Sequence, residues 1–196
     1  ARNIGYIPRS KSAAKAHVTF SVPTTTTSDF ITLEAGLVCL GRQDNTSYRF
    51  STPQDITASV INGQAQFGTP EKPIEICRGS YLTRQFLVNT SVDQRFILDN
   101  PNIDTSTISV FVKGINDTGL GLEYKKVDNI LNIDKNSEIF LLQEVQDEHY
   151  ELLFGDGYFG KEVENNAVIT VRYIVTDGAS GNGPSVFDFQ GNFVDQ

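Results

Sequence analysis

The sequence predicts a mainly β protein with little helix, built as two small antiparallel β domains of the sandwich type. Many short segments alternate between apolar and polar residues, which is the pattern of a half-buried strand. Clusters of Gly, Pro, Asn and Asp separate these segments and mark turns. Only Ser10–Ala16 shows even a brief helical period. The 196 residues suffice for one large or two small domains, each able to bury a core.

The first half of the chain contains the clearest alternation, in Ala16–Val22, where every second residue is apolar. Asn62-Gly63 predicts a two-residue hairpin turn, because both residues tolerate positive φ, and Gln64–Phe67 is the expected returning strand. The other strands expected in this half are Ile31–Leu33, Leu37–Leu40, Tyr48–Ser51, Ile56–Ile61, Ile74–Cys77 and Tyr81–Asn89.

The second half supplies further strands by the same criterion, and we expect them at Arg95–Leu98, Ile108–Val112, Ile139–Val145, His149–Phe154 and Ala167–Thr176. A boundary near Asn89–Gln94 separates the two halves. We therefore predict an N-terminal β domain over 1–92 and a second β domain over 93–177 that contains a hairpin at Phe154–Gly160. Residues 178–196 are rich in Gly and Asn and predict a connector to sequence beyond this chain, which lacks methionine.

Composition argues against several function classes. The formal net charge of −8 disfavours nucleic-acid binding, which needs clustered Lys and Arg. The one local group of basic residues, Arg9, Lys11 and Lys15, is typical of a solvated lead-in. No apolar stretch reaches the length of a membrane span and no signal peptide opens the chain, so we expect no membrane association.

The two cysteines, Cys39 and Cys77, lie in apolar, strand-like runs without a Cys-x-x-Cys partner or a nearby histidine. Free cysteine in such a setting behaves as a small buried hydrophobe, and zinc binding is not indicated. We expect reduced, buried thiols and synthesis inside a cell.

Three groups of residues could carry chemistry. Asp156, between Gly155 and Gly157, could bind a metal, but calcium loops use several oxygen ligands, so a tight turn in which Asp156 bonds the local backbone is favoured. Asp134–Glu138 imitates the start of a calcium loop and is better interpreted as a polar loop. An acidic cluster could support acid–base catalysis, but its position predicts a solvated turn; it comprises Glu144, Asp147, Glu148, His149 and Glu151.

The remaining histidine, His17, is on the polar face of its strand and is expected to face solvent. No catalytic fingerprint for a serine hydrolase, P-loop, zincin or dinucleotide enzyme is present. The sequence thus predicts no enzyme, no catalytic residue, no cofactor and no metal site.

The run Tyr150–Lys161, followed by Asn165–Tyr173 and Thr176–Gly183, resembles the baseplate J-like family of contractile tails. In that family a Phe-Gly-Asp-Gly turn precedes a strand ending in Tyr and then a Gly-Asn segment. The stretch from Phe96–Leu98 to Val110–Val112 is similar to the baseplate wedge subunits of large myophages. The resemblance marks as structural motif residues Phe154, Gly155, Asp156, Gly157, Gly160, Tyr173, Gly178, Gly181 and Asn182.

This resemblance implies a structural virion protein of the tail baseplate, made in the host cytoplasm. It implies a wedge subunit that pairs with itself and with other wedge subunits in a ring around the hub, which rearranges on sheath contraction. An alternative is a secreted or surface β-sandwich that binds carbohydrate. Its support would be Thr-rich loops, the aromatics Tyr48 and Tyr81, a Cys39–Cys77 disulfide, and glycosylation patterns at Asn45, Asn89 and Asn116.

A third hypothesis is a tail-associated hydrolase, which needs two carboxylates in one cleft. Glu144 with Glu151 is the best pair that the sequence offers for it.

Overall fold

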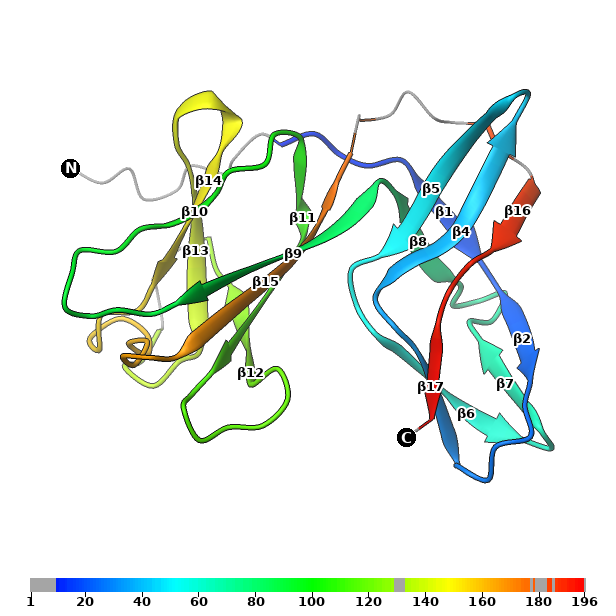
Figure 1. Ribbon diagram of the computed structural model, residues 1–196, viewed down its shortest axis with the longest axis horizontal. Coiled ribbons are helices and arrows are strands. Elements are labelled where there is room, and N and C mark those ends of the chain that lie inside the picture. The colour runs from blue at the N-terminus through cyan, green and yellow to red at the C-terminus, as the bar shows by residue number, and fades with distance from the viewer. Residues whose placement is uncertain (1–9, 129–132, 177, 179–182, 185, 196) are drawn as a thin grey trace. The chain divides into compact units, whose positions relative to one another are not determined.

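The computed structural model describes residues 10–128, 133–176, 178, 183–184 and 186–195. The chain forms two compact units (Figure 1). Thr83–Tyr173, with Ser10, make up the inserted unit, so named because it interrupts the sequence of the other. Lys11–Leu82 and the described residues of Ile174–Gln196 make up the sandwich unit.

Two five-stranded sheets form the sandwich unit, in the orders β1-β8-β5-β4-β16 and β17-β3-β6-β7-β2. Their registers are antiparallel, and their inner faces enclose an apolar core that includes Leu33, Phe67 and Ile76. The strands are β1 (Lys15–Val18), β2 (Phe20–Pro23), β3 (Phe30–Leu33), β4 (Gly36–Gln43), β5 (Thr46–Thr52), β6 (Ile56–Ile61), β7 (Gln64–Phe67), β8 (Ile74–Arg78), β16 (Val186–Phe189) and β17 (Phe193–Asp195).

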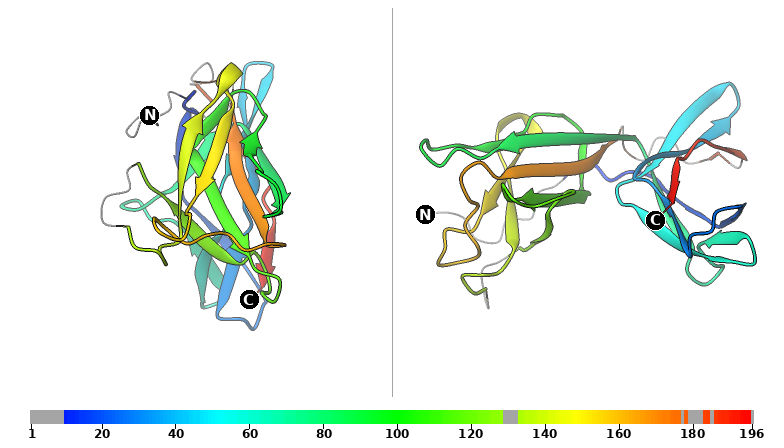
Figure 2. Two further views of the ribbon diagram at one scale, coloured as in Figure 1. Left: turned by 90° about the vertical axis from the view of Figure 1, so that its left-hand side faces the viewer. Right: turned by 60° about the horizontal axis from the view of Figure 1, so that its bottom comes forward.

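One seven-stranded sheet forms the inserted unit, in the order β10-β14-β13-β12-β11-β15-β9. The sheet curls on itself, since Phe86 on the edge strand β9 and Phe96 on the opposite edge strand β10 have ring centroids 5.6 Å apart (Figure 2). The strands are β9 (Ser80–Leu87), β10 (Phe96–Leu98), β11 (Ile103–Lys113), β12 (Leu122–Lys126), β13 (Ile139–Glu144), β14 (Tyr150–Phe154) and β15 (Val168–Val175), and a short 3-10 turn, η1, spans Gln146–Glu148.

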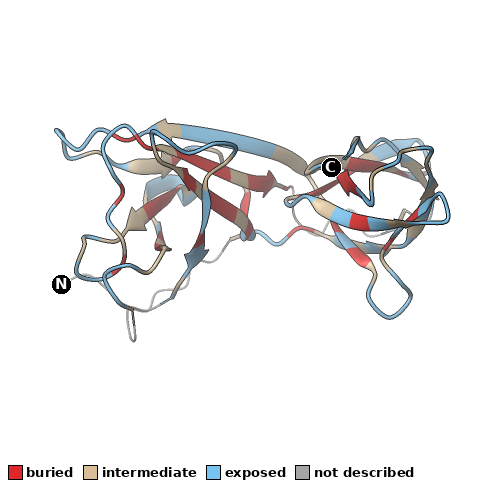
Figure 3. Ribbon diagram, turned by 90° about the horizontal axis from the view of Figure 1, so that it is seen from below, coloured by how far each residue is buried: buried red, intermediate tan, exposed pale blue. Residues whose placement is uncertain are grey.

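These elements confirm the predicted mainly β, sandwich-like fold class with little helix. Buried residues concentrate on the strands and exposed residues on the loops (Figure 3). The Asn62-Gly63 turn is confirmed as well, with φ of 51° and 73° and with Ile61 opposite Gln64. Both turn residues adopt the left-handed conformation that a two-residue hairpin requires.

The predicted Ala16–Val22 strand is split at Thr19. β1 pairs with β8 in one sheet and β2 pairs with β7 in the other, so the chain crosses between the two sheets at this point. The alternation persists across the split, because the apolar residues on both sides of Thr19 pack against the same core. The brief helix considered at Ser10–Ala16 is wrong, since Lys15 and Ala16 already belong to β1.

The predicted connector 178–196 also needs correction. β16 pairs with β4 and β17 pairs with β3, so the C-terminal segment adds one edge strand to each sheet of the sandwich unit. Phenylalanines at alternate positions anchor it, a signal that the surrounding Gly and Asn residues obscured. Four rings with neighbouring centroids 5.1–5.3 Å apart close a cluster that joins the segment to the core: Phe20, Phe67, Phe189 and Phe193.

The division between the units also differs from the predicted ranges 1–92 and 93–177. The chain passes from one unit to the other within β9, after Leu82, and within β15, after Tyr173. The loop proposed as a boundary lies inside the inserted unit, where the Val88 amide donates to the Ala167 carbonyl at 2.9 Å. At these two passages an unbroken strand carries the chain, so no Gly- or Pro-rich linker marks them, whereas the passage from Ser10 to Lys11 lies outside any strand.

Candidate interaction surface

The Phe154–Gly160 turn follows β14 in the inserted unit and is closed by its own hydrogen bonds. The Asp156 Oδ1 atom accepts from the backbone amides of Tyr158, at 3.0 Å, and Phe159, at 2.9 Å. The Gly157 amide donates to the Gly160 carbonyl at 3.1 Å. Asp156 therefore bonds the local backbone, as the sequence indicated, and its carboxylate organises a turn.

The turn does not form the predicted hairpin. β14 pairs with β13 and β10, whereas β15 lies between β11 and β9 in the curled sheet. The chain after the turn makes an isolated parallel bridge from Gly155 to Glu162 and runs across to β15. The hairpin prediction is wrong because local glycine spacing reveals a reversal of the chain but not which strands become neighbours in the sheet.

Two glycines of the turn are required for different reasons. A Cβ atom on Gly155 would lie 2.2 Å from the Gly160 carbonyl carbon and 2.3 Å from its oxygen, so the two backbones touch. Gly157 has φ of +81°, a conformation that other L-residues rarely adopt, but a Cβ there would meet nothing nearer than 3.8 Å. Lack of space excludes a side chain at position 155, whereas the backbone conformation disfavours one at position 157.

A neighbouring loop supports the turn. The Gly160 amide donates to the Asp134 carbonyl at 3.0 Å, and the Lys161 amide donates to the Ser137 carbonyl at 2.8 Å. The supporting loop is itself an Asx turn, in which Asp134 Oδ1 accepts from the Asn136 amide at 2.7 Å. These bonds favour the polar-loop interpretation of residues 134–138. Within the described part of the chain, no group of three or more His, Cys, Asp or Glu side chains could hold a metal ion.

The turn displays two aromatic side chains to solvent. Tyr158 is 83% exposed and Phe159 is 52% exposed, while Gly160 beside them is buried. Large aromatic rings held outward on a hydrogen-bonded turn are typical of a protein contact surface. Apolar character alone did not predict that this pair is exposed, although two consecutive aromatics cannot both point to the buried face of a strand.

The acidic cluster is not a catalytic pair. In the β13–β14 register Glu144 lies opposite Tyr150, and Gln143 lies opposite Glu151. Successive residues of a strand point to opposite faces, so Glu144 and Glu151 are on different faces of the sheet. Glu151, whose side chain is 10% exposed, instead forms a two-point ion pair with Arg95 at 2.8 and 2.7 Å. The nearby Glu151 carboxylate raises the pKa of Arg95.

The remaining acidic residues occupy the turn that the sequence predicted. Asp147 and Glu148 lie in η1, between β13 and β14, and both are exposed. The Val145 amide donates to the His149 carbonyl at 2.8 Å across this turn.

His17, in the sandwich unit, is exposed, as expected.

The other predicted motif residues are scattered. Tyr173 is buried in β15, and its hydroxyl donates a hydrogen bond to the side-chain oxygen of Asn100. Burial raises the pKa of Tyr173. Gly178 follows β15 outside any strand, and Gly181 and Asn182 lie outside the described residues.

Two of the features that would favour carbohydrate binding, the Cys39–Cys77 disulfide and a freely exposed Tyr48, are not present among the described residues. Cys39 lies opposite Phe50 and Cys77 lies opposite Ser51, so the two thiols are on different faces of one sheet. Both are free and buried, which confirms the predicted state, and burial raises the pKa of Cys39. The Tyr48 ring is only partly exposed and is stacked under an arginine guanidinium at 4.4 Å.

Of the N-terminal basic residues, Lys15 is engaged by an acidic residue on the paired strand β8. Lys15 forms an ion pair with Glu75 at 2.8 Å, and Arg9 lies outside the described residues. No helix in the described part of the chain is both long and apolar enough to cross a membrane.

The chain is similar in sequence to proteins of the phage tail baseplate. Residues 82–179 match the family model described as the third domain of bacteriophage baseplate wedge protein gp6. Baseplate wedge protein gp6 of Enterobacteria phage T4 is 23% identical over 207 residues. That alignment covers 96% of this chain and 30% of the T4 protein, so the chain spans less than a third of that relative.

Proposed function

The chain belongs to the family of bacteriophage baseplate wedge protein gp6, and on this premise we propose that it is a structural module of a phage tail baseplate wedge. It acts through contacts with other wedge subunits and with copies of its own protein, in the ring around the hub that rearranges on sheath contraction. It is made in the host cytoplasm and incorporated into the virion. It catalyses no reaction.

The observation that carries this proposal is the exposed aromatic pair, Tyr158 and Phe159, on the inserted unit. Aromatic side chains dominate the energetics of protein interfaces, provided that they fill a pocket on the partner. Their turn is held by the two bonds that Asp156 accepts and by the bonds that the Gly160 and Lys161 amides donate to the 134–138 loop. Little conformational entropy is therefore lost when the turn binds, which favours affinity.

The proposed absence of catalysis rests on the carboxylates. The best pair for a hydrolase, Glu144 and Glu151, is divided between two faces of a sheet, and Glu151 is neutralised by Arg95. A general acid and base must both reach one substrate, which this arrangement does not allow.

The test is assembly of the full-length wedge protein that contains this chain. The wild type is mixed with the other wedge proteins of its phage, and the complexes are measured by sedimentation velocity. We expect association, and we expect the double substitution Tyr158→Ser, Phe159→Ser to weaken it by about tenfold or more, the loss typical of an interface hot spot.

Ile61→Ser is the matched control, because Ile61 is 69% exposed on a hairpin of the sandwich unit. It also replaces an exposed apolar side chain by serine, and its association should equal that of the wild type. A wild-type protein that does not associate with any wedge protein would contradict the proposed function. Unchanged association of the double variant would exclude the turn as the contact.

A further inference from the structure

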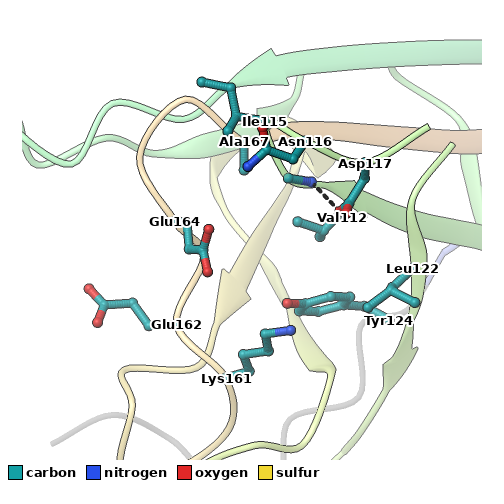
Figure 4. A pocket seen from close by; sticks show the side chains of 11 residues that line it. Val112, Ile115, Asn116, Asp117, Leu122, Tyr124, Lys161, Glu162, Glu164 and Ala167 are labelled. Atoms are coloured by element: carbon teal, nitrogen blue, oxygen red, sulfur yellow. Dashed lines mark hydrogen bonds between the residues drawn. The ribbon is translucent and has the colours of Figure 1, made fainter. Parts of the chain in front are cut away.

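A pocket of about 250 Å³ opens in the inserted unit beside the connection between β14 and β15 (Figure 4). One wall is the end of β11 with the loop that follows it, another is β12, and the third is the connection itself. Eleven residues line it: Val112, Gly114, Ile115, Asn116, Asp117, Leu122, Tyr124, Lys161, Glu162, Glu164 and Ala167.

The pocket has an apolar interior. Val112, Tyr124 and Ala167 are buried there, whereas Ile115 and Leu122 are exposed near its opening. Its volume is below the roughly 300–1,000 Å³ of pockets that bind drug-sized molecules. The space therefore suits a single protruding side chain better than a cofactor or a metabolite.

The lining is acidic. It contains the carboxylates of Asp117, Glu162 and Glu164 and the single ammonium group of Lys161. Lys161 Nζ is 3.3 Å from the Glu138 carboxylate, which lies outside the lining, so its charge is already balanced. Glu162 and Glu164 are both exposed, and neither forms an ion pair with any described residue. Figure 4 shows both on the segment that borders the pocket.

A second, independent feature is the Tyr124 hydroxyl. Tyr124 is 4% exposed, no hydrogen bond joins its hydroxyl to a described residue, and its oxygen points into the pocket, where a ligand can reach it (Figure 4). Its oxygen can accept a hydrogen bond from a donor that enters the pocket. Burial first, and then the charges of Glu138 and Glu164, raise the pKa of Tyr124 to about 12, which keeps the hydroxyl neutral and its lone pairs available.

We propose that this pocket receives an arginine side chain from a neighbouring protein of the baseplate wedge. A guanidinium group has five N–H donors in a planar fork, which can serve two carboxylates and a phenol oxygen together. Its three-carbon stem packs on apolar walls such as Val112 and Leu122. The identity of the neighbour as a wedge protein rests on the proposed function, whereas the specificity of the pocket for a guanidinium does not.

The test uses small probes on the 196-residue chain. N-acetyl-arginine amide is titrated in nuclear magnetic resonance, with N-acetyl-citrulline amide as a probe of nearly the same shape without the charge. We expect saturable shifts at the methyl groups of Ile115 and Leu122 and at the Tyr124 ring. The citrulline probe should bind about fivefold more weakly or worse.

Variants separate the site from the overall charge. Glu162→Gln with Glu164→Gln should reduce arginine binding to the level of citrulline. Asp147→Asn with Glu148→Gln removes two charges from an exposed turn of the same unit that does not line the pocket, and binding should be unchanged. Tyr124→Phe should keep the fold, since it removes a hydroxyl without a partner, and should weaken arginine binding about threefold.

Three results would overturn the proposal: equal binding of both probes, shifts outside the lining only, or equal losses in the two charge variants. Each concerns the pocket alone and is read without any wedge protein present. A failure of the proposed function would appear instead in the sedimentation of the full-length protein, so the two failures are distinguishable.

Discussion

Replacing Gly155 by alanine tests whether backbone contact, rather than backbone conformation, determines the structure of the Phe154–Gly160 turn. The added Cβ would lie 2.2 Å from the carbonyl carbon of Gly160, 2.3 Å from its oxygen and 2.7 Å from its Cα. All three are backbone atoms, so no side-chain rotation can relieve the overlap. The turn would have to open, which would disturb the bond from the Gly160 amide to the Asp134 carbonyl.

Overpacking of a well-packed site costs about 1–3 kcal/mol, and overlap with backbone places Gly155→Ala near the upper end, at about 3 kcal/mol. Gly119→Ala is the matched control in the same unit. Gly119 has φ of +65°, but a Cβ there meets no atom within 4 Å. Only the left-handed conformation then opposes alanine, at about 1–2 kcal/mol.

Unfolding in urea is monitored by hydrogen–deuterium exchange in peptides from β13 and β14, because these strands belong to the inserted unit. With a dependence of about 1.5 kcal/mol per M, Gly155→Ala should lower the midpoint by about 2 M and Gly119→Ala by about 0.7–1.3 M. If both variants shift the midpoint equally, the close approach of Gly155 to Gly160 does not stabilise the unit and the reasoning fails.

Three further predictions follow from other contacts. Phe193→Ala should destabilise the sandwich unit by about 2 kcal/mol in urea denaturation, because a partly buried ring of the phenylalanine cluster is lost. Val194→Ala on the same strand should cost less than half of this free energy. Equal losses would contradict the anchoring role of the cluster. Arg95→Ala leaves the buried Glu151 carboxylate without its ion-pair partner, and adding Glu151→Gln removes that unpaired charge. The single variant should therefore have a lower unfolding temperature than the double variant. The reverse order would refute this account of the ion pair. The free energy of unfolding of the inserted unit should fall as the pH rises from about 10 to 12. The pKa of Tyr124 is raised in the folded state, so the unfolded chain loses this proton at a lower pH than the folded chain does. Tyr124→Phe should remove this part of the pH dependence.

The fold class was predictable because it depends on local patterns. The Asn62-Gly63 turn was confirmed, and the alternation in Ala16–Val22 correctly identified the residues that face the core, although the strand itself is split at Thr19. The C-terminal strands were not predicted, because β16 and β17 pair with β4 and β3, which are far away in the sequence. No local pattern identifies such partners, and a short strand acquires its structure from them.

The same limit applies to the candidate site. The role of Asp156 followed from its glycine neighbours, since its hydrogen bonds reach only two and three residues ahead. The sheet order, which separates β14 from β15, did not follow from any local feature. The orientation of Tyr124 was equally hidden, because its burial comes from its place opposite Val110 in β11 and from the connection that covers it.

The connection from Gly155 to Ala167 links the two candidate contact features. It carries the exposed aromatics Tyr158 and Phe159 at one end and the acidic pocket residues Glu162 and Glu164 at the other. Most connections in compact domains have about 4–6 residues, and much longer ones usually serve a function or are disordered. This one is also held rigid, since Val163 and Ala167 are buried and Gly160 and Lys161 bond the 134–138 loop. A rigid connection that presents an apolar anchor beside a cation-binding pocket suits a partner segment with an arginine next to an apolar patch, so losses from the aromatic and glutamate variants should add when both contacts are made.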